Sequence, residues 1–284
     1  MSDVLVLNLF VAAGLNFVTQ AIQIGAYAAR IAGVTTLRIA TAISLFSLVV
    51  TASRLATLVV TPALGALADV PAYAASAAHR STVDPTALHV LDTQFRIIVA
   101  AGSLGVLAGG LLMPVFIVMF VRGVRSFERT GSIPTALLRL LDPRVVFDLV
   151  RAVRIPPLSK ARTLPFGAIP RKLVIGNTVI STVYAIGVVA AYYASDLNLE
   201  ARGTAIGLSG LVNGIGTVAF SLFVDPTSAY IVDQTVRNER PVSHVYAMIV
   251  VLVATAFVGT VLAQLALYPA AVYIAAGSHI FVKH

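Results

Sequence analysis

Residues 38–69 read RIATAISLFSLVVTASRLATLVVTPALGALAD, and between the arginine and the aspartate that bound this stretch the only charged residue is Arg54. An apolar run of this length exceeds the roughly 20 residues that a helix needs to cross about 30 Å of hydrocarbon. The whole chain has the same character, because 58% of its residues are hydrophobic and only 11% are charged. A water-soluble domain could not bury so much apolar surface, so the sequence predicts an all-α polytopic membrane protein.

Six stretches are long and apolar enough to be membrane-spanning helices. The first ends in the triplet AYA at residues 26–28, which is similar to a signal-peptide cleavage site. It begins with Asp3 instead of a basic residue, however, and its apolar part is longer than that of a signal peptide, so we expect it to remain as a helix. The expected spans are 4–29, 39–67, 97–121, 173–194, 203–232 and 245–278, the last of them long enough to be tilted or broken at Pro269.

Basic residues are concentrated in one connection between these spans. Of the 20 lysines and arginines, 11 lie between Arg122 and Lys172, a segment with three acidic residues. The positive-inside rule therefore predicts that this connector is cytoplasmic and that both termini are outside. Its apolar positions at helical spacing predict one or two amphipathic helices on the cytoplasmic leaflet, although a simple topological anchor is an alternative. These positions are Leu138, Leu141, Val145, Leu149 and Val153.

The two halves of the chain resemble each other. The stretches 38–69 and 202–233 both begin with arginine and end with aspartate 31 steps later, and their last eight residues are PALGALAD and PTSAYIVD. Three spans per half would reverse the second half relative to the first, giving an inverted repeat with substrate sites at the repeat interface. We expect the first three-helix repeat at 1–121, the basic connector at 122–172 and the second repeat at 173–284. Each third span also carries a glycine before a proline, at Gly105 and Pro114 and at Gly259 and Pro269.

Polar residues recur on one face of the first and fourth spans. They follow helical spacing, so each set shares one side of its helix. Such residues either make hydrogen bonds between helices, worth about 0.6–2 kcal/mol each, or line a hydrophilic groove. Glycines of the fifth span similarly indicate either close helix packing or a flexible wall. The residues are Asn16, Gln20, Gln23 and Tyr27 in the first span, Asn177, Ser181 and Tyr184 in the fourth, and Gly207, Gly210, Gly214 and Gly216 in the fifth.

Arg54 and Asp225 are charged residues inside predicted spans. A charge at the centre of a bilayer costs about 2.5–3.5 kcal/mol, so such residues normally have a partner or face water. An ion pair between the two is one interpretation. Counted from Arg38 and Asp233, however, Arg54 lies roughly 24 Å and Asp225 roughly 12 Å into the membrane, so the pair would need shifted or broken helices. The other interpretation is that Arg54 is kept for an anionic ligand.

The run AYAARIAGVTTLRIATAISLFSLVVTASRLATLVVTPALGALAD, residues 26–69, resembles the signature region of the bacterial Amj family, the lipid II flippases that are alternates to MurJ. Six spans, the chain length and the basic central connector fit that family as well. The resemblance implies a multi-pass protein of the bacterial cytoplasmic membrane. It further implies a function in peptidoglycan synthesis, in which undecaprenyl-pyrophosphate-linked disaccharide pentapeptide moves from the cytoplasmic to the outer leaflet.

On this reading, the substrate-binding residues lie along a polar groove. A guanidinium presents a rigid fork that matches phosphate oxygens, so we expect Arg54 to engage the pyrophosphate at mid-membrane. Arg30 and Arg38 would collect it at the cytoplasmic mouth. Because six helices enclose little volume, we also expect a homodimer. The candidate substrate-binding set is Asn16, Gln20, Gln23, Arg30, Arg38, Arg54 and Asp225.

Two other classes of function stay open. A secondary transporter of a small solute or ion would use Asp225 as its coupling carboxylate, and a non-transporting scaffold would use the connector to recruit partners or anionic lipid. We expect no enzyme activity, cofactor or metal site, because the chain has no cysteine, scattered histidines and no phosphate-binding loop. The clustered basic residues do not resemble a nucleic-acid-binding face. The stretch 84–92, DPTALHVLD, is expected to be a solvated outer loop.

Overall fold

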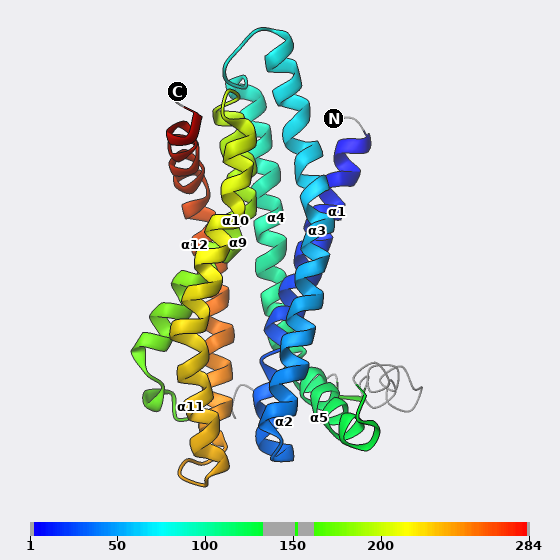
Figure 1. Ribbon diagram of the computed structural model, residues 1–284, viewed down its shortest axis with the longest axis vertical. Coiled ribbons are helices and arrows are strands. Elements are labelled where there is room, and N and C mark those ends of the chain that lie inside the picture. Colours follow the sequence, from blue (N-terminus) through cyan, green and yellow to red (C-terminus); the bar gives the residue numbers. More distant parts are fainter. Residues whose placement is uncertain (1–2, 133–150, 153–161, 283–284) are drawn as a thin grey trace.

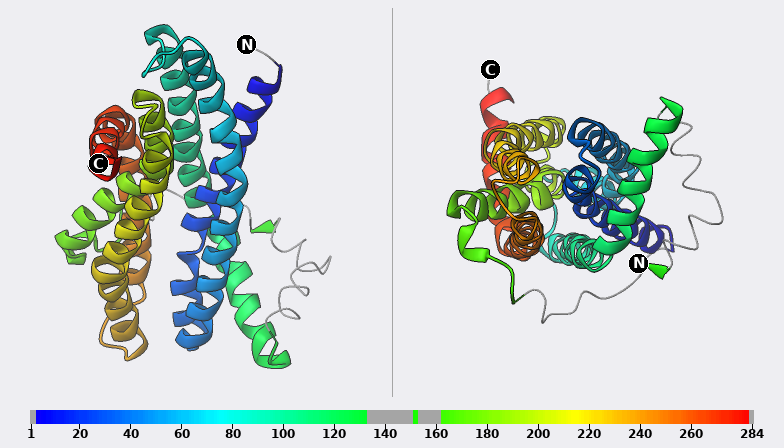
Figure 2. Two further views of the ribbon diagram at one scale, coloured as in Figure 1. Left: turned by 45° about the horizontal axis from the view of Figure 1, so that its top comes forward. Right: turned by 90° about the horizontal axis from the view of Figure 1, so that it is seen from below.

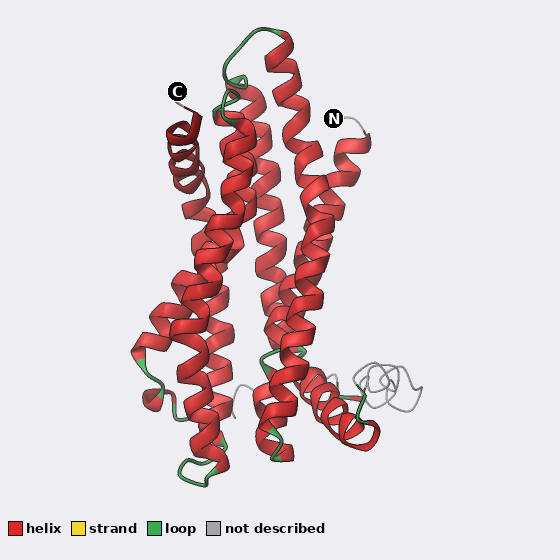
Figure 3. Ribbon diagram, viewed as in Figure 1, coloured by secondary structure: helices red, strands yellow, loops and turns green. Residues whose placement is uncertain are grey.

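The structure of the chain, a computed structural model, describes residues 3–132, 151–152 and 162–282. Every regular element in these ranges is a helix (Figure 3). The first half of the chain contains α1 (Asp3–Gly25), α2 (Ala28–Thr36), α3 (Ile39–Ala77), α4 (Pro85–Leu111) and α5 (Met113–Thr130). The second half contains η1 (Phe166–Ala168), α9 (Arg171–Leu197), α10 (Arg202–Ala219), η2 (Phe220–Val224), α11 (Asp225–Val236) and α12 (Ser243–Val282).

Six helical stretches in the described residues are long and apolar enough to cross a membrane, which confirms the predicted number. The first half supplies α1 with α2, then α3, then α4, and the second supplies α9, the α10–η2–α11 stretch and α12. Both termini lie at one end of the bundle, and α5 lies at the other (Figure 1). We call these the terminus end and the connector end.

The third span differs from the prediction, which placed it at residues 97–121. It is α4, and it begins twelve residues earlier, at Pro85. Asp84 caps this helix by accepting a hydrogen bond of 2.9 Å from the Thr86 amide, which also holds the pKa of Asp84 below its usual range. The stretch 84–92 is therefore the start of a helix and not a loop. α4 ends at Leu111, because Pro114 cannot continue a helix and instead occupies the first turn of α5.

The helix α5 lies against α2 at the connector end and leaves the bundle at an angle (Figure 1). It packs closely there, because the Phe116 ring occupies the space that a Cβ on Gly25 would need. An ion pair between Arg38 and Glu128 also joins the start of α3 to α5. The amphipathic helices predicted from Leu138 onward lie almost entirely outside the described residues.

One close packing arrangement occurs in both halves. In the first, Asn16 of α1 donates a hydrogen bond of 2.8 Å to the Ile98 carbonyl of α4, and a Cβ on Gly105 would overlap the Phe17 carbonyl. Only glycine allows that backbone approach. In the second half the donor is Asn177 of α9, the acceptor is the Leu252 carbonyl of α12 at 2.9 Å, and the glycine–carbonyl pair is Gly259 and Thr178.

Corresponding helices of the two halves run in opposite directions. α1 runs from the terminus end towards the connector end and α9 runs back, while α3 and α10 are opposed in the same way, as are α4 and α12 (Figure 1). The halves stand side by side when the bundle is seen along its axis (Figure 2). They meet where α4 packs on α12 and α3 packs on α9. α12 stays helical through Pro269, where the sequence allowed a break.

Candidate functional site

A cavity of about 480 Å³ lies between the two halves of the chain. Its walls come from α1, α3 and α4 on one side and from α9, α10 and α12 on the other. Along α3 the lining extends from Phe46 to Leu64, which corresponds to roughly 27 Å of helix. That length approaches the thickness of the hydrocarbon core, about 30 Å. The cavity therefore follows the direction in which a transported group would have to move.

The polar face of α1 lines this cavity. Asn16, Gln20 and Gln23 are lining residues on one side of the helix. Tyr27, which lies beyond the end of α1 at Gly25, lines the cavity as well. Asn16 also makes the interhelical hydrogen bond to α4. Asn16 therefore both joins α1 to α4 and lines the cavity.

Of the polar residues of α9, one makes interhelical hydrogen bonds and two line the cavity. Ser181 and Tyr184 line the cavity, and the Tyr184 hydroxyl lies 2.7 Å from the Thr217 hydroxyl of α10. Asn177 is fully buried instead, with its amide donating to the Leu252 carbonyl and to the Thr255 hydroxyl at 2.8 Å. Asn177 is thus a structural residue, whereas the next two polar positions of the helix face the cavity.

The lining combines polar residues with a larger apolar surface and, among the residues that the structure describes, includes no charged one. Amides and hydroxyls are distributed over both halves, between apolar residues. Two polar lining atoms, Thr19 Oγ1 and Asn213 Oδ1, are buried without a protein hydrogen-bond partner, although such atoms are normally paired. The polar lining residues are Asn16, Thr19, Gln20, Gln23, Tyr27, Thr57, Thr61, Ser181, Tyr184, Asn213, Thr217 and Thr260.

An ion pair between the halves lies next to the connector end of the cavity. Arg30 Nη2 of α2 donates to Asp225 Oδ1 of α11 across 2.9 Å. The guanidinium also lies 5.0 Å from the ring centroid of Tyr27 and 5.3 Å from that of Phe46, two lining residues. The Arg30 side chain is only 11% exposed, and its Nη1 is buried without a hydrogen-bond partner among the described residues.

Among the described residues the partner of Asp225 is Arg30, and α3 continues as a helix through Pro62. The alternative pairing of Arg54 with Asp225 stays a prediction. Arg54 belongs to α3, between Val50 and Thr57, which line the cavity, but its own side chain lies outside what the structure describes.

The comparisons with known proteins agree with the resemblance seen in residues 26–69. A family model described as Amj, alternate to MurJ, matches residues 15–277. The chain belongs to the Amj family. It is also similar to the lipid II flippase Amj of Bacillus subtilis (strain 168), with 31% identity over 257 residues, which covers 90% of this chain and 91% of that protein. No solved structure matches the chain.

In this Amj-family member, three of the four glycines singled out in α10 make no close packing contact with the described residues. A Cβ at Gly207, Gly210 or Gly214 would meet nothing within 4 Å, and Gly214 lines the cavity. Gly216 has only an ordinary contact, with the Tyr184 ring at 3.6 Å. The side of α10 with these three glycines is open, while close approaches occur at glycines of α1, α4, α9 and α12, such as Gly25, Gly105, Gly187 and Gly259.

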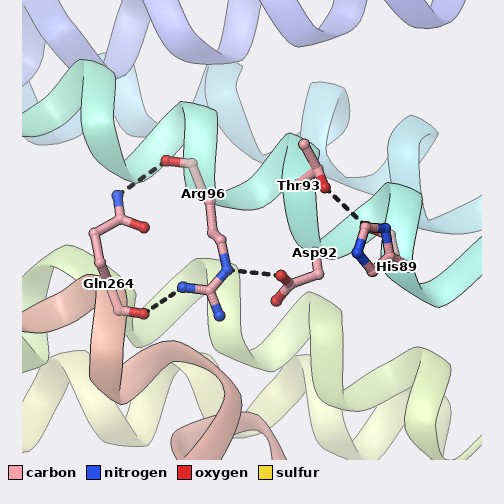
Figure 4. Close-up of polar contacts among 5 residues, drawn as sticks. All are labelled: His89, Asp92, Thr93, Arg96 and Gln264. Carbon is pink, nitrogen blue, oxygen red and sulfur yellow. Dashed lines mark hydrogen bonds and ion pairs between the residues drawn. The ribbon is translucent and has the colours of Figure 1, made fainter.

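A second polar cluster was missed by the sequence analysis. Arg96 of α4 donates from Nε to Asp92 at 2.6 Å and from Nη1 to the Gln264 carbonyl of α12 at 2.6 Å, and the Gln264 amide donates back to the Arg96 carbonyl at 3.0 Å (Figure 4). It ties α4 to α12 across the halves. The charge of Arg96 was the available signal, and it was overlooked because the predicted span began one residue later.

Proposed function

We propose that the chain is a lipid II flippase, which moves undecaprenyl-pyrophosphate-linked peptidoglycan precursor across the bacterial cytoplasmic membrane through the cavity between its halves. The main support for this proposal is that neutral polar residues of α1 and α9 line one cavity that extends along the bundle. The family and the name of the B. subtilis relative, a lipid II flippase, support the substrate. Membership of a flippase family favours a transporter over an enzyme.

The lining fits the headgroup of such a lipid better than its tail. The prenyl chain can stay in hydrocarbon, whereas sugars and peptide must exchange their water for other hydrogen-bonding groups. Amides such as Gln20 and Gln23 and hydroxyls such as Thr57 and Ser181 offer donors and acceptors without a fixed charge. They can therefore replace water around hydroxyl groups without binding the headgroup too tightly to release it.

The pyrophosphate needs a positive partner, and we assign that role to arginines beside the lining. Arg30 is already buried against the cavity-lining rings of Tyr27 and Phe46, and its free Nη1 can donate to an anionic oxygen. Arg54 lies on α3 within the lined stretch, and Arg38 lies at the connector end. We propose that Arg38 collects the headgroup, and that Arg30 and Arg54 hold its pyrophosphate during passage. Asp225 then competes for Arg30 and helps to release the anion.

We propose that the two halves are inverted repeats, with the first at 1–121, the connector at 122–172 and the second at 173–284. The recurring asparagine–carbonyl and glycine–carbonyl contacts and the opposed helix directions support this assignment. The basic connector supports a cytoplasmic connector end, amphipathic segments on that leaflet and both termini outside. Since one chain builds both walls of the cavity, the expected homodimer is not needed to form it.

The experiment that tests this function is complementation of a bacterial strain that lacks its other lipid II flippase. Arg54→Ala and Arg54→Lys should both fail to support growth at normal protein level, because lysine keeps the charge but not the fork. Arg80→Lys is the matched control, since Arg80 pairs with Asp84 at the surface and far from the cavity lining. Normal growth with both Arg54 variants would contradict the role of Arg54, and failure of the wild-type chain to complement would contradict the function.

A secondary transporter is the second candidate, because Asp225 is a carboxylate within a membrane-capable stretch. Its ion pair with Arg30 favours a different role, since a coupling carboxylate must be able to take up a proton or a cation. Asp225→Asn discriminates the two functions. Loss of ion-dependent uptake of a small solute would favour the transporter, whereas unchanged uptake together with impaired lipid II flipping would favour the flippase.

A further inference from the structure

An ion pair joins the two halves of the bundle towards its terminus end. Arg202, the first residue of α10, pairs with Asp69 of α3. The same guanidinium lies 3.8 Å from Asp196, a fully buried carboxylate at the end of α9. The start of α10 is therefore held against the opposite half by one pair and against its own half by the other.

The connector end carries the equivalent residues without the equivalent pair. Position 38 corresponds to 202 and position 69 to 233, because both differ by 164, as do the prolines at 62 and 226. By this correspondence Arg38 should face Asp233. Instead Arg38 pairs with Glu128 of α5, and Asp233 pairs with Arg237 of its own helix at 2.8 Å.

The missing pair involves two segments that already contact each other, α2 and α11. Arg30 and Asp225 join these segments, and both segments continue from there towards the connector end. Asp233 follows Asp225 within α11, whereas α2 ends at Thr36 and Arg38 lies at the turn into α3, after the left-handed Leu37. A closer approach of the two segments at the connector end would be needed to bring Arg38 to Asp233.

We propose that Arg202–Asp69 and Arg38–Asp233 are two alternating gates, of which the structure has the first closed and the second open. This inference rests on the proposed transport function. Rocking of one half against the other around the Arg30–Asp225 pair would exchange the gates, as the pseudo-symmetry of an inverted repeat requires. The cavity would then open alternately to the two ends of the bundle.

The charged residues around each gate keep the free-energy difference between the two gate states small. Exposed ion pairs are individually weak, so breaking one and forming another changes the energy little. When the gates switch, Arg38 leaves Glu128 and Arg202 keeps Asp196, so neither guanidinium loses all of its carboxylate partners. Asp69, whose side chain is 69% exposed, can be solvated by water.

Cysteine crosslinking tests this proposal directly, because the chain contains no cysteine that would give a background signal. The full-length chain in bacterial membranes would carry Asp69→Cys with Arg202→Cys, or Arg38→Cys with Asp233→Cys. Glu128→Cys with Asp233→Cys is the matched control at the connector end. A short thiol-specific crosslinker followed by gel analysis reports each pair, independently of flipping.

We expect both gate pairs to crosslink several-fold more than the control pair, and the Asp69–Arg202 crosslink to stop flipping. In a variant with all four cysteines, locking the Asp69–Arg202 gate first should lower crosslinking of the other gate several-fold. Failure of the Arg38–Asp233 pair to exceed the control, or simultaneous crosslinking of both gates, would overturn the proposal. If the gates alternate but the wild-type chain does not flip lipid II, the alternation stands and the proposed substrate is wrong.

Discussion

Arg30 of α2 and Asp225 of α11 form an ion pair of 2.9 Å that joins the two halves beside the connector end of the cavity. Each comes from a segment that starts at a helix break, since α1 ends at Gly25 and a π-helical turn, η2, precedes Pro226. Such breaks allow helices to change direction, so two residues far apart in the sequence meet.

Removal of either partner of this pair should destabilise the protein more than removal of both. Arg30→Ala leaves the carboxylate unpaired, and Asp225→Ala leaves a mostly buried guanidinium unpaired, so we expect each to lower the free energy of unfolding by about 1–3 kcal/mol. The double variant should recover part of this loss. A double-mutant cycle measured by thermal unfolding in detergent checks it, and strictly additive effects would contradict a direct pair.

Alanine at the packing glycines should destabilise the bundle, whereas alanine at an open glycine should not. Gly105→Ala and Gly259→Ala place a Cβ against a backbone carbonyl, so we expect a loss of about 1–3 kcal/mol from each. Gly207→Ala is the control, because its Cβ meets nothing and alanine favours a helix by up to about 1 kcal/mol. Melting temperatures should fall for the first two variants only, and equal shifts for all three would contradict the packing.

Alanine substitutions of Asn177 in α9 and Gln20 in α1 should have different effects, the first on stability and the second on flipping. Asn177→Ala removes two buried interhelical hydrogen bonds, so the melting temperature should fall by an amount equivalent to about 1–2 kcal/mol. Gln20→Ala changes the wall of the cavity and should reduce flipping while leaving the melting temperature nearly unchanged. A fall in melting temperature for Gln20→Ala but not for Asn177→Ala would show that the structural and cavity-lining roles were assigned to the wrong side chains.

Arg96 should act as a structural clamp between α4 and α12. Arg96→Ala deletes the bond to the Gln264 carbonyl and leaves Asp92 without its partner, and we expect a loss of about 1–3 kcal/mol in unfolding free energy. Arg80→Ala removes an exposed pair between the α3–α4 loop and the N-cap of α4, and should cost at most about 1 kcal/mol. Equal losses would mean that the clamp contributes no more than a surface pair does.

Much of the architecture could be predicted because its signals are local. Apolar runs near 20–40 residues define membrane crossings whatever their neighbours are, and the helical period places Asn16, Gln20 and Gln23 on one face. The start of α4 was placed too late, because the cap at Asp84 and the charge of Arg96 lie within a polar-looking stretch that only tertiary contacts stabilise in the bundle.

The sequence by itself determined the membrane class, the six crossings, the polar faces and the family. Only the tertiary structure decided that Asp225 meets Arg30, that Asn177 is buried while Ser181 faces a cavity, and that both halves form its walls. The physical reason is that hydropathy and periodicity fix which face of a helix is polar. The partner of that face depends on how far each helix is rotated and shifted along its axis, which is set by close packing such as that at Gly105 and Gly259.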